Sequence, residues 1–287
     1  MHRSAVAFLA VLATALVAVS LSAAASHRLA KAHVYHRIIS LSPTVTEDLF
    51  AIGAGKRVIA VDQDSNYPSR APRTSLSGYT PNSEAIANYH PDLVLISYNP
   101  HNFAAQMRSL GIKVVMVPAA ANLAQTYSEI LQIGKLTGHP KGAAGVVGWM
   151  KTRLAQIVAS VPASRRHLRV YHELDQTYYS ATSKTFIGSI YKLFGFTNIA
   201  DAADTSGSGY PQLSGEYIVQ QDPQIIVLAD TRCCDQTAET VAARPGWSGI
   251  SAVVHHRVVG VNDDVASRWG PRIVQFARRV AEIAKSG

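Results

Sequence analysis

Tyrosine and glutamate side chains occur in the same order in two distant stretches of this chain. A Gly-Tyr pair, ending at Tyr79 and again at Tyr210, precedes a Glu-x-Ile triplet that begins at Glu84 and at Glu216. A proline follows each triplet, ahead of an apolar run. The separation, roughly 130 residues, is too long for a solenoid repeat and indicates two similar lobes. An interface between lobes is a favoured place for a ligand.

The tyrosines have the chemistry of a binding site. A tyrosine offers a flat apolar face and a phenol that can hydrogen-bond or reach a metal chelate. Tyr67 and Tyr98 lie near the ends of predicted strands, where α/β folds place their ligands. Any one of these side chains is as readily structural, but the matched pair of Tyr79 and Tyr210 favours binding.

The matched glutamates have two interpretations. Glu84 follows Asn82 and Ser83, and Glu216 follows Ser214, so each glutamate fits the first turn of a capped helix, where the helix dipole favours an acid. Capping explains each glutamate alone. It does not explain why the same glutamate recurs beside the same tyrosine, which indicates a shared function.

The segment 262–272 concentrates charge around an indole. It follows the last predicted strand and contains Asp264, Arg268 and Trp269. Such a sequence also occurs in ordinary surface loops, but a tryptophan among charges favours a binding wall.

Signals of enzymes and of metal sites are missing. The sequence has no Walker loop, HExxH or CxxC motif, and its histidines lack helical pair spacing, so we expect no catalytic residues and no metal ligands. The only cysteines are Cys233 and Cys234. Adjacent cysteines cannot join distant segments; they can form a vicinal disulfide, stay as thiols or bind a soft metal.

Composition describes an exported globular protein. The chain has 287 residues, 47% of them hydrophobic and 16% charged, and a net charge of +8 without a basic block, so nucleic acid is not an expected partner. Residues 1–25 predict a signal peptide: a basic start, an apolar stretch and a small-residue cleavage site. The alternative is an uncleaved segment that tethers the protein to a membrane.

Alternating strands and helices predict an α/β fold with parallel sheets. A segment at 141–161, bracketed by Pro140 and Pro162, predicts one helix of about 30 Å. Gly142, Gly145 and Gly148 weaken it, so we expect close packing there. We predict an N-terminal lobe at 36–138, a rigid connecting helix at 139–163 and a C-terminal lobe at 164–287. Strands are predicted at 37–41, 57–61, 93–97, 113–117, 168–173, 225–229 and 258–261, and further helices at 44–52, 101–110, 122–137, 186–194, 237–243 and 271–285.

Together these residues resemble the substrate-binding proteins of ABC importers for vitamin B12, ferric siderophores and haem. The matching pieces run from Arg37 to Pro43 with Thr46-Glu47, then Asn66-Tyr67-Pro68, the unit from Glu84 to Val94, the run from Leu110 to Val114, and Trp269 to Arg272. The resemblance covers residues 36–285.

This resemblance implies two Rossmann-like lobes joined by one long rigid helix, with a metal chelate between them and no intrinsic cofactor. It implies that Glu84 and Glu216 dock onto arginines of a membrane permease dimer, and that a monomer works outside the cytoplasm, in the periplasm or the extracellular space. Cobalamin binders often have tryptophans where this chain has Tyr79 and Tyr210, so a ferric siderophore, a corrinoid and haem all stay open. The candidate ligand contacts are Pro43, Tyr67, Tyr79, Tyr98, Tyr210, Asp264, Arg268 and Trp269.

Two alternatives share the expected architecture. One is an extracytoplasmic enzyme or metallocluster-assembly protein, which clustered metal ligands would favour. The other is an exported sensory or adaptor protein that contacts a receptor and delivers no ligand.

Overall fold

The computed structural model describes residues 33–286, of which 34–286 belong to one compact unit. The predicted signal peptide at residues 1–25 lies outside the described residues. Among residues 33–286, no helix is both long enough and apolar enough to cross a membrane.

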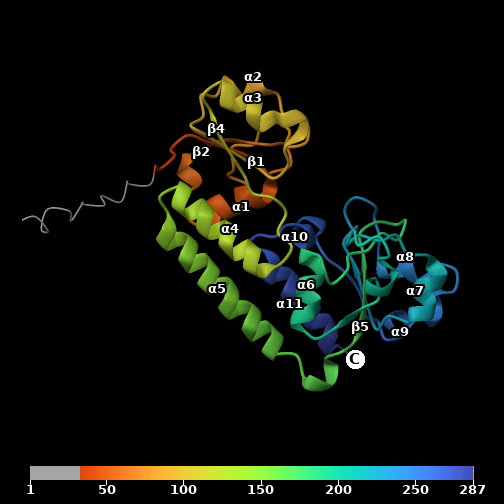
Figure 1. The fold of residues 1–287 in the computed structure, drawn as a ribbon. Coiled ribbons are helices and arrows are strands. Elements are labelled where there is room, and N and C mark those ends of the chain that lie inside the picture. The colour runs from red at the N-terminus through yellow and green to blue at the C-terminus, as the bar shows by residue number, and fades with distance from the viewer. Residues whose placement is uncertain (1–32, 287) are drawn as a thin grey trace, which may run out of the picture. The chain divides into compact units, whose positions relative to one another are not determined.

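Two parallel sheets form the framework (Figure 1). The first has the order β2-β1-β3-β4 and the second the order β6-β5-β7-β8, so the two sheets share one topology. Most of these strands are short apolar runs, as expected for parallel strands that are covered on both faces. Their bounds are β1 Ile38–Leu41, β2 Val58–Val61, β3 Leu93–Ile96, β4 Lys113–Met116, β5 Arg169–Glu173, β6 Thr197–Asn198, β7 Ile225–Leu228 and β8 Val258–Gly260.

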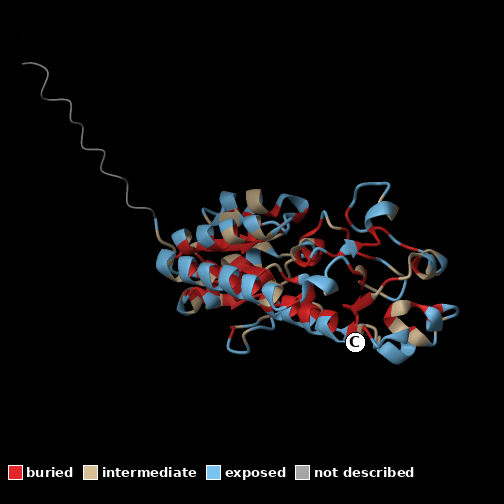
Figure 2. Ribbon diagram, turned by 90° about the horizontal axis from the view of Figure 1, so that it is seen from below, coloured by how far each residue is buried: buried red, intermediate tan, exposed pale blue. Residues whose placement is uncertain are grey.

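Helices connect and cover the strands, and Figure 2 shows the buried residues along the strands and on the inner sides of the helices. The α/β fold with two parallel sheets is therefore confirmed. The helices around the first sheet are α1 Pro43–Ala51, α2 Ser83–Ala87, α3 Phe103–Ser109 and α4 Leu123–Leu136. Those around the second are α6 Phe186–Leu193, α7 Gly215–Gln221, α8 Ala238–Ala242, α9 Ser251–Val254, α10 Asp263–Ser267 and α11 Ile273–Lys285.

Helix α5, Pro140–Ala159, stands in the chain between the two sheets and packs against α4 and α11 (Figure 1). It buries Ala143, Val147, Met150 and Leu154, whose spacing places them on one face of the helix. The lobe boundaries at 138/139 and 163/164, and the rigidity of this helix, stay predictions.

The glycines of α5 follow the expected packing only in part. A Cβ on Gly142 would lie 2.1 Å from the carbonyl oxygen of Ile52, so the backbones of α5 and of the α1 C-terminus meet there. Gly145 and Gly148 have no atom within 4 Å of an added Cβ, and the prediction of close packing is wrong for these two.

Helix α1 begins earlier than the sequence suggests. Its N-cap is Ser42, whose hydroxyl accepts from the backbone N–H of Val45, and Pro43 occupies the first turn. Proline suits that place because its missing N–H would have no partner there. The predicted start of this helix at residue 44 is therefore one residue too late.

Candidate functional site

A cavity of about 420 Å³ opens at the carboxyl ends of β1 and β3, against the segment that contains α10. Parallel sheets generally place ligands at this edge. Residues from both predicted lobes line the cavity, and six of the predicted ligand contacts are among them: Pro43, Tyr79, Tyr98, Asp264, Arg268 and Trp269.

Two tyrosines stand in this cavity with little covering them. Tyr79 is 72% exposed and Tyr98 is 58% exposed. Gly78 brings the loop of Tyr79 against β1, because a Cβ on it would lie 2.6 Å from the carbonyl oxygen of Leu41. Below Tyr98, the hydroxyl of Ser97 donates to that of Ser42 at 2.7 Å, which ties the end of β3 to the start of α1. Exposed aromatic rings on a fixed backbone are suited to bind an apolar or aromatic ligand.

Asp62 lies at the bottom of the same cavity and was not predicted as a site residue. Its side chain is almost fully buried. Burial raises the pKa of this carboxyl to about 6, against the opposing effect of a hydrogen bond with Ser65. Nothing in its sequence context, the end of an apolar strand, distinguishes it from an ordinary loop aspartate.

Four charged residues, Glu47, Asp264, Arg268 and Arg272, form an ion-pair network beside the cavity. Arg268 Nη1 donates to Glu47 Oε1 at 2.8 Å, and Arg268 Nη2 donates to Asp264 Oδ1 at 2.7 Å. Arg272 donates from Nε and Nη2 to the two oxygens of Glu47, and burial of this glutamate is nearly complete. The network joins α1 to the chain around α10, so it joins the two predicted lobes.

The ion-pair network occupies most of the hydrogen-bond donors of Arg268. Besides Glu47 and Asp264, its guanidinium donates to the side chain of Asn66 and to the carbonyl oxygen of Asp64. A guanidinium with these four acceptors is held as part of the wall of the cavity. Its direct contact with a ligand stays a prediction.

Two predicted contacts are not in this cavity. Tyr67 lines a separate cavity of about 290 Å³, where the guanidinium of Arg272 lies 4.3 Å from its ring centroid. Tyr210 is 47% exposed and lines neither cavity. Tyr79 therefore lines the larger of these two cavities and Tyr210 does not, and a ligand site shared by the matched pair stays a prediction.

Glu84 and Glu216 occupy equivalent places in the two halves. Each is exposed in the first turn of a short helix, α2 or α7, that precedes β3 or β7. Asn82 caps α2 by accepting from Ala85 N, and Ser214 caps α7 by accepting from Tyr217 N. The predicted caps are confirmed. Since neither carboxylate belongs to the ion pairs found among residues 33–286, both are available to a partner.

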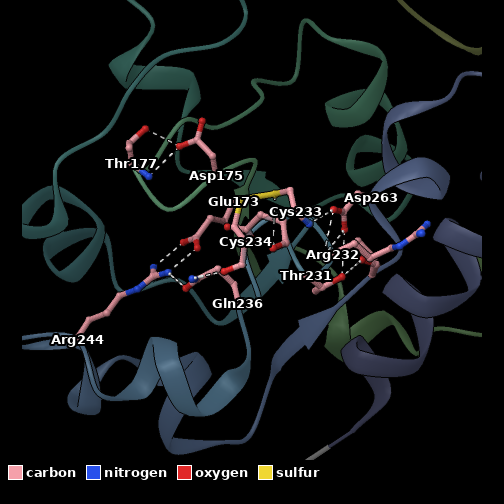
Figure 3. The surroundings of a disulfide bond; sticks show 12 residues. Glu173, Asp175, Thr177, Thr231, Arg232, Cys233, Cys234, Gln236, Arg244 and Asp263 are labelled. Carbon is pink, nitrogen blue, oxygen red and sulfur yellow. Dashed lines mark hydrogen bonds and ion pairs between the residues drawn. A yellow bond between two sulfur atoms is a disulfide. The ribbon is translucent and has the colours of Figure 1, made fainter. Parts of the chain in front are cut away.

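The carboxyl edge of the second sheet carries different chemistry (Figure 3). Cys233 and Cys234 form a vicinal disulfide in the loop after β7. Beside it, Arg244 donates to both oxygens of the buried Glu173 at 2.6 Å. Burial, and then the charge of Glu173, raise the pKa of Asp230 to about 7. Within residues 33–286 no group of three or more His, Cys, Asp or Glu side chains is placed to hold a metal ion.

Residues 38–265 match the protein family described as "Periplasmic binding protein". The chain belongs to this family. It is 34% identical over 255 residues to the cobalamin-binding protein of Halobacterium salinarum, with 85% of this chain and 68% of the relative covered. It is 32% identical over 255 residues to the Bacillus subtilis "uncharacterized ABC transporter substrate-binding lipoprotein YvrC", with 86% and 79% covered.

Solved structures agree with this family. One from Staphylococcus epidermidis, described as a possible iron-binding (periplasmic solute-binding) protein, has a TM-score of 0.76 and 28% identity, and the match covers 88% of this chain and 99% of that one. The relatives named here are described as binding proteins, which agrees with the expectation that the chain is not an enzyme.

Proposed function

We propose that this protein is the extracytoplasmic substrate-binding component of an ABC importer, and that it captures a metal chelate and delivers it to the permease. The chelate is a corrinoid, haem or a ferric siderophore. The observation that carries this proposal is the family match over residues 38–265, together with relatives described as cobalamin-binding and as ABC substrate-binding.

The cavity at the first sheet edge supports the proposal. It has about 420 Å³ of space, two exposed tyrosine rings, and charged groups on one side. Binding sites for small molecules have this mixture of apolar walls and few placed polar groups. Pro43, Tyr79, Tyr98, Asp264 and Trp269 are the proposed ligand contacts, with Arg268 as part of the wall. Tyr67 and Tyr210 are proposed contacts only if the ligand extends beyond this cavity.

The exposed glutamates support delivery to a membrane permease. Glu84 and Glu216 lie at equivalent helix starts in the two halves, as expected for a protein that meets a two-fold permease dimer with one contact per lobe. Arginines of the permease would pair with them in charge-assisted hydrogen bonds. The protein acts as an exported monomer, in the periplasm or at the outer cell surface, and nucleic acid is not among its proposed binding partners.

Native mass spectrometry of the protein purified from its own host's growth medium tests the proposal. We expect one chelate per monomer, released on denaturation, with the mass and the metal of a corrinoid, a porphyrin or a siderophore. Titration of the purified protein with cyanocobalamin, hemin and ferrioxamine B, read by quenching of intrinsic fluorescence, then ranks the classes. If nothing co-purifies and none of the three chelates binds, the proposal is wrong.

A further inference from the structure

The vicinal disulfide of Cys233 and Cys234 has no evident structural purpose. A disulfide stabilises a protein mainly by closing a loop in the unfolded chain, which lowers the entropy of the unfolded state. A disulfide between neighbouring residues closes almost no loop, so this stabilisation is small. The loop is already held by Asp263: Thr231 Oγ1 donates to it at 3.1 Å, and the backbone N–H groups of Arg232 and Cys233 donate to it at 3.2 Å. The disulfide therefore needs another explanation.

The topology places the disulfide at a ligand-binding position. Leu41 pairs with Ile96 at the ends of β1 and β3, and Glu173 pairs with Leu228 at the ends of β5 and β7. With the same strand order in both sheets, the loop after β7 corresponds to the loop after β3. The loop after β3 carries Tyr98, which lines the cavity.

Contacts connect the disulfide loop to the cavity directly. Arg232, the residue before Cys233, donates from Nη1 to Asp264 Oδ2 at 3.1 Å, and Asp264 lines the cavity. Cys233 itself is exposed. In Figure 3 the S–S bond lies on the side of its loop away from Gln236, whose amide donates to Cys234 O.

The chemistry of the pair suits a flat partner. A disulfide sulfur does not ionise, and sulfur makes favourable contacts with aromatic rings. The disulfide thus presents an apolar, polarisable surface, whereas two free thiols at this position would be reactive.

We infer that Cys233 and Cys234 form the second-lobe wall of the ligand site and contact the face of a planar tetrapyrrole. This inference rests on the proposed function and narrows its ligand class. Tyr79 and Tyr98 cover the tetrapyrrole from the first lobe. Arg232 lies beside the disulfide, where its guanidinium can donate to a propionate of a porphyrin or to an amide oxygen of a corrin side group. A globular ferric siderophore has no such face.

Variants of the full mature protein test the wall. We expect C233A/C234A to bind cyanocobalamin or hemin, whichever the wild type binds, about two- to twelvefold more weakly, which is the range of a sulfur contact with a ring. Affinity for ferrioxamine B, if it is bound, stays within twofold of wild type. The matched control is Gln236→Ala, which removes three side-chain hydrogen bonds of the same loop, to Cys234 O and from Thr240 and Arg244, and leaves the sulfurs in place. It should retain tetrapyrrole affinity, and thermal unfolding establishes that both variants are folded.

Protection from reduction gives an independent readout that does not depend on a variant. Tris(2-carboxyethyl)phosphine takes oxygen from water as the S–S bond breaks and two thiols form. A bound tetrapyrrole that covers the pair should slow this reaction several-fold, and ferrioxamine B should not.

The outcomes separate the two proposals. Unchanged tetrapyrrole affinity in C233A/C234A, an equal loss in Gln236→Ala, or reduction that is not slowed overturns the disulfide wall and leaves the importer function standing. Preference of the wild type for ferrioxamine B alone also overturns the wall. If the wild type binds no chelate, both proposals fail.

Discussion

Replacing Glu47 by glutamine tests whether the ion-pair network holds the two halves together. The carboxylate accepts three charge-assisted hydrogen bonds, one from Arg268 and two from Arg272, and only 2% of its side chain is exposed. The side chains of Arg268 and Arg272 are 9% and 14% exposed. Solvent therefore screens this network little, and glutamine leaves Arg272 without an anionic partner.

The expected loss follows from these contacts. Removing one partner of a buried ion pair costs about 3–5 kcal/mol. Glutamine keeps one acceptor oxygen and Arg268 keeps Asp264, so the lower end applies, about 3 kcal/mol. For a unit of this size that corresponds to a decrease of roughly 6–12 °C in Tm.

Thermal and urea unfolding, followed by circular dichroism, measure the loss. Glu282→Gln is the matched control, because Glu282 pairs with Arg279 at 3.3 Å with both side chains about half exposed, 49% and 50%. It should change the free energy of unfolding by less than about 0.5 kcal/mol. A second variant, Glu47→Gln with Arg272→Met, should recover part of the loss because no arginine is then buried unpaired. A loss below about 1 kcal/mol in Glu47→Gln, or one equal to that of the control, would refute the reasoning.

Three further predictions concern the site and the docking surface. Glu84→Ala combined with Glu216→Ala should lower the free energy of unfolding by no more than about 1 kcal/mol per site and leave chelate affinity unchanged. Uptake by the double variant should fall by more than the sum of the effects of the two single variants. Normal uptake would remove the docking assignment. Tyr79→Ala and Tyr98→Ala should each weaken chelate binding about three- to tenfold without a fall in Tm, because both rings are exposed; titration that shows wild-type affinity would exclude them as contacts. Asp62 has its pKa raised from 3.8 to about 6 in the folded protein, so the folded state holds a proton that the unfolded state releases between these values. The free energy of unfolding should therefore fall as pH rises from about 4 to 6, and Asp62→Asn should remove this part of the pH dependence; an unaltered pH profile in the variant would contradict the assigned pKa.

The sequence predicted most strands and long helices because their apolar residues follow clear periods. β7 and α5 have bounds within two residues of the prediction. β6, Thr197–Asn198, was missed because two residues carry no period. The order of the strands in each sheet was not predictable either. It depends on which connections between strands cross over a neighbouring strand, and the residue pattern of a single strand does not show this.

The candidate site was predictable where its residues are unusual for their context. Tyr79, Tyr98 and Trp269 are large aromatics in polar loops, and such residues are conspicuous in a sequence. Glu47 and Asp62 were not proposed as site residues because their importance comes from burial and from partners far away in the chain, such as Arg268 and Arg272. For Tyr210, sequence symmetry predicts an equivalent position in the second lobe, but it does not determine which cavity that position faces. Contact of Tyr210 with a ligand stays a prediction.

The two halves share one topology, but different side chains lie at the carboxyl ends of their strands. This difference limits where a ligand can contact the second lobe. Glu173 at the end of β5 is equivalent to Leu41 at the end of β1. The buried carboxylate of Glu173 forms an ion pair with Arg244. That guanidinium also lies 4.6 Å from the ring centroid of Trp247, so the strand end is filled by an ion pair and an aromatic ring. Opening this arrangement for a ligand would leave a buried charge without a partner, which is costly. The second lobe can therefore contribute to the ligand site mainly through its surface loops, the disulfide loop and the segment around Asp264, while the first lobe supplies the cavity itself.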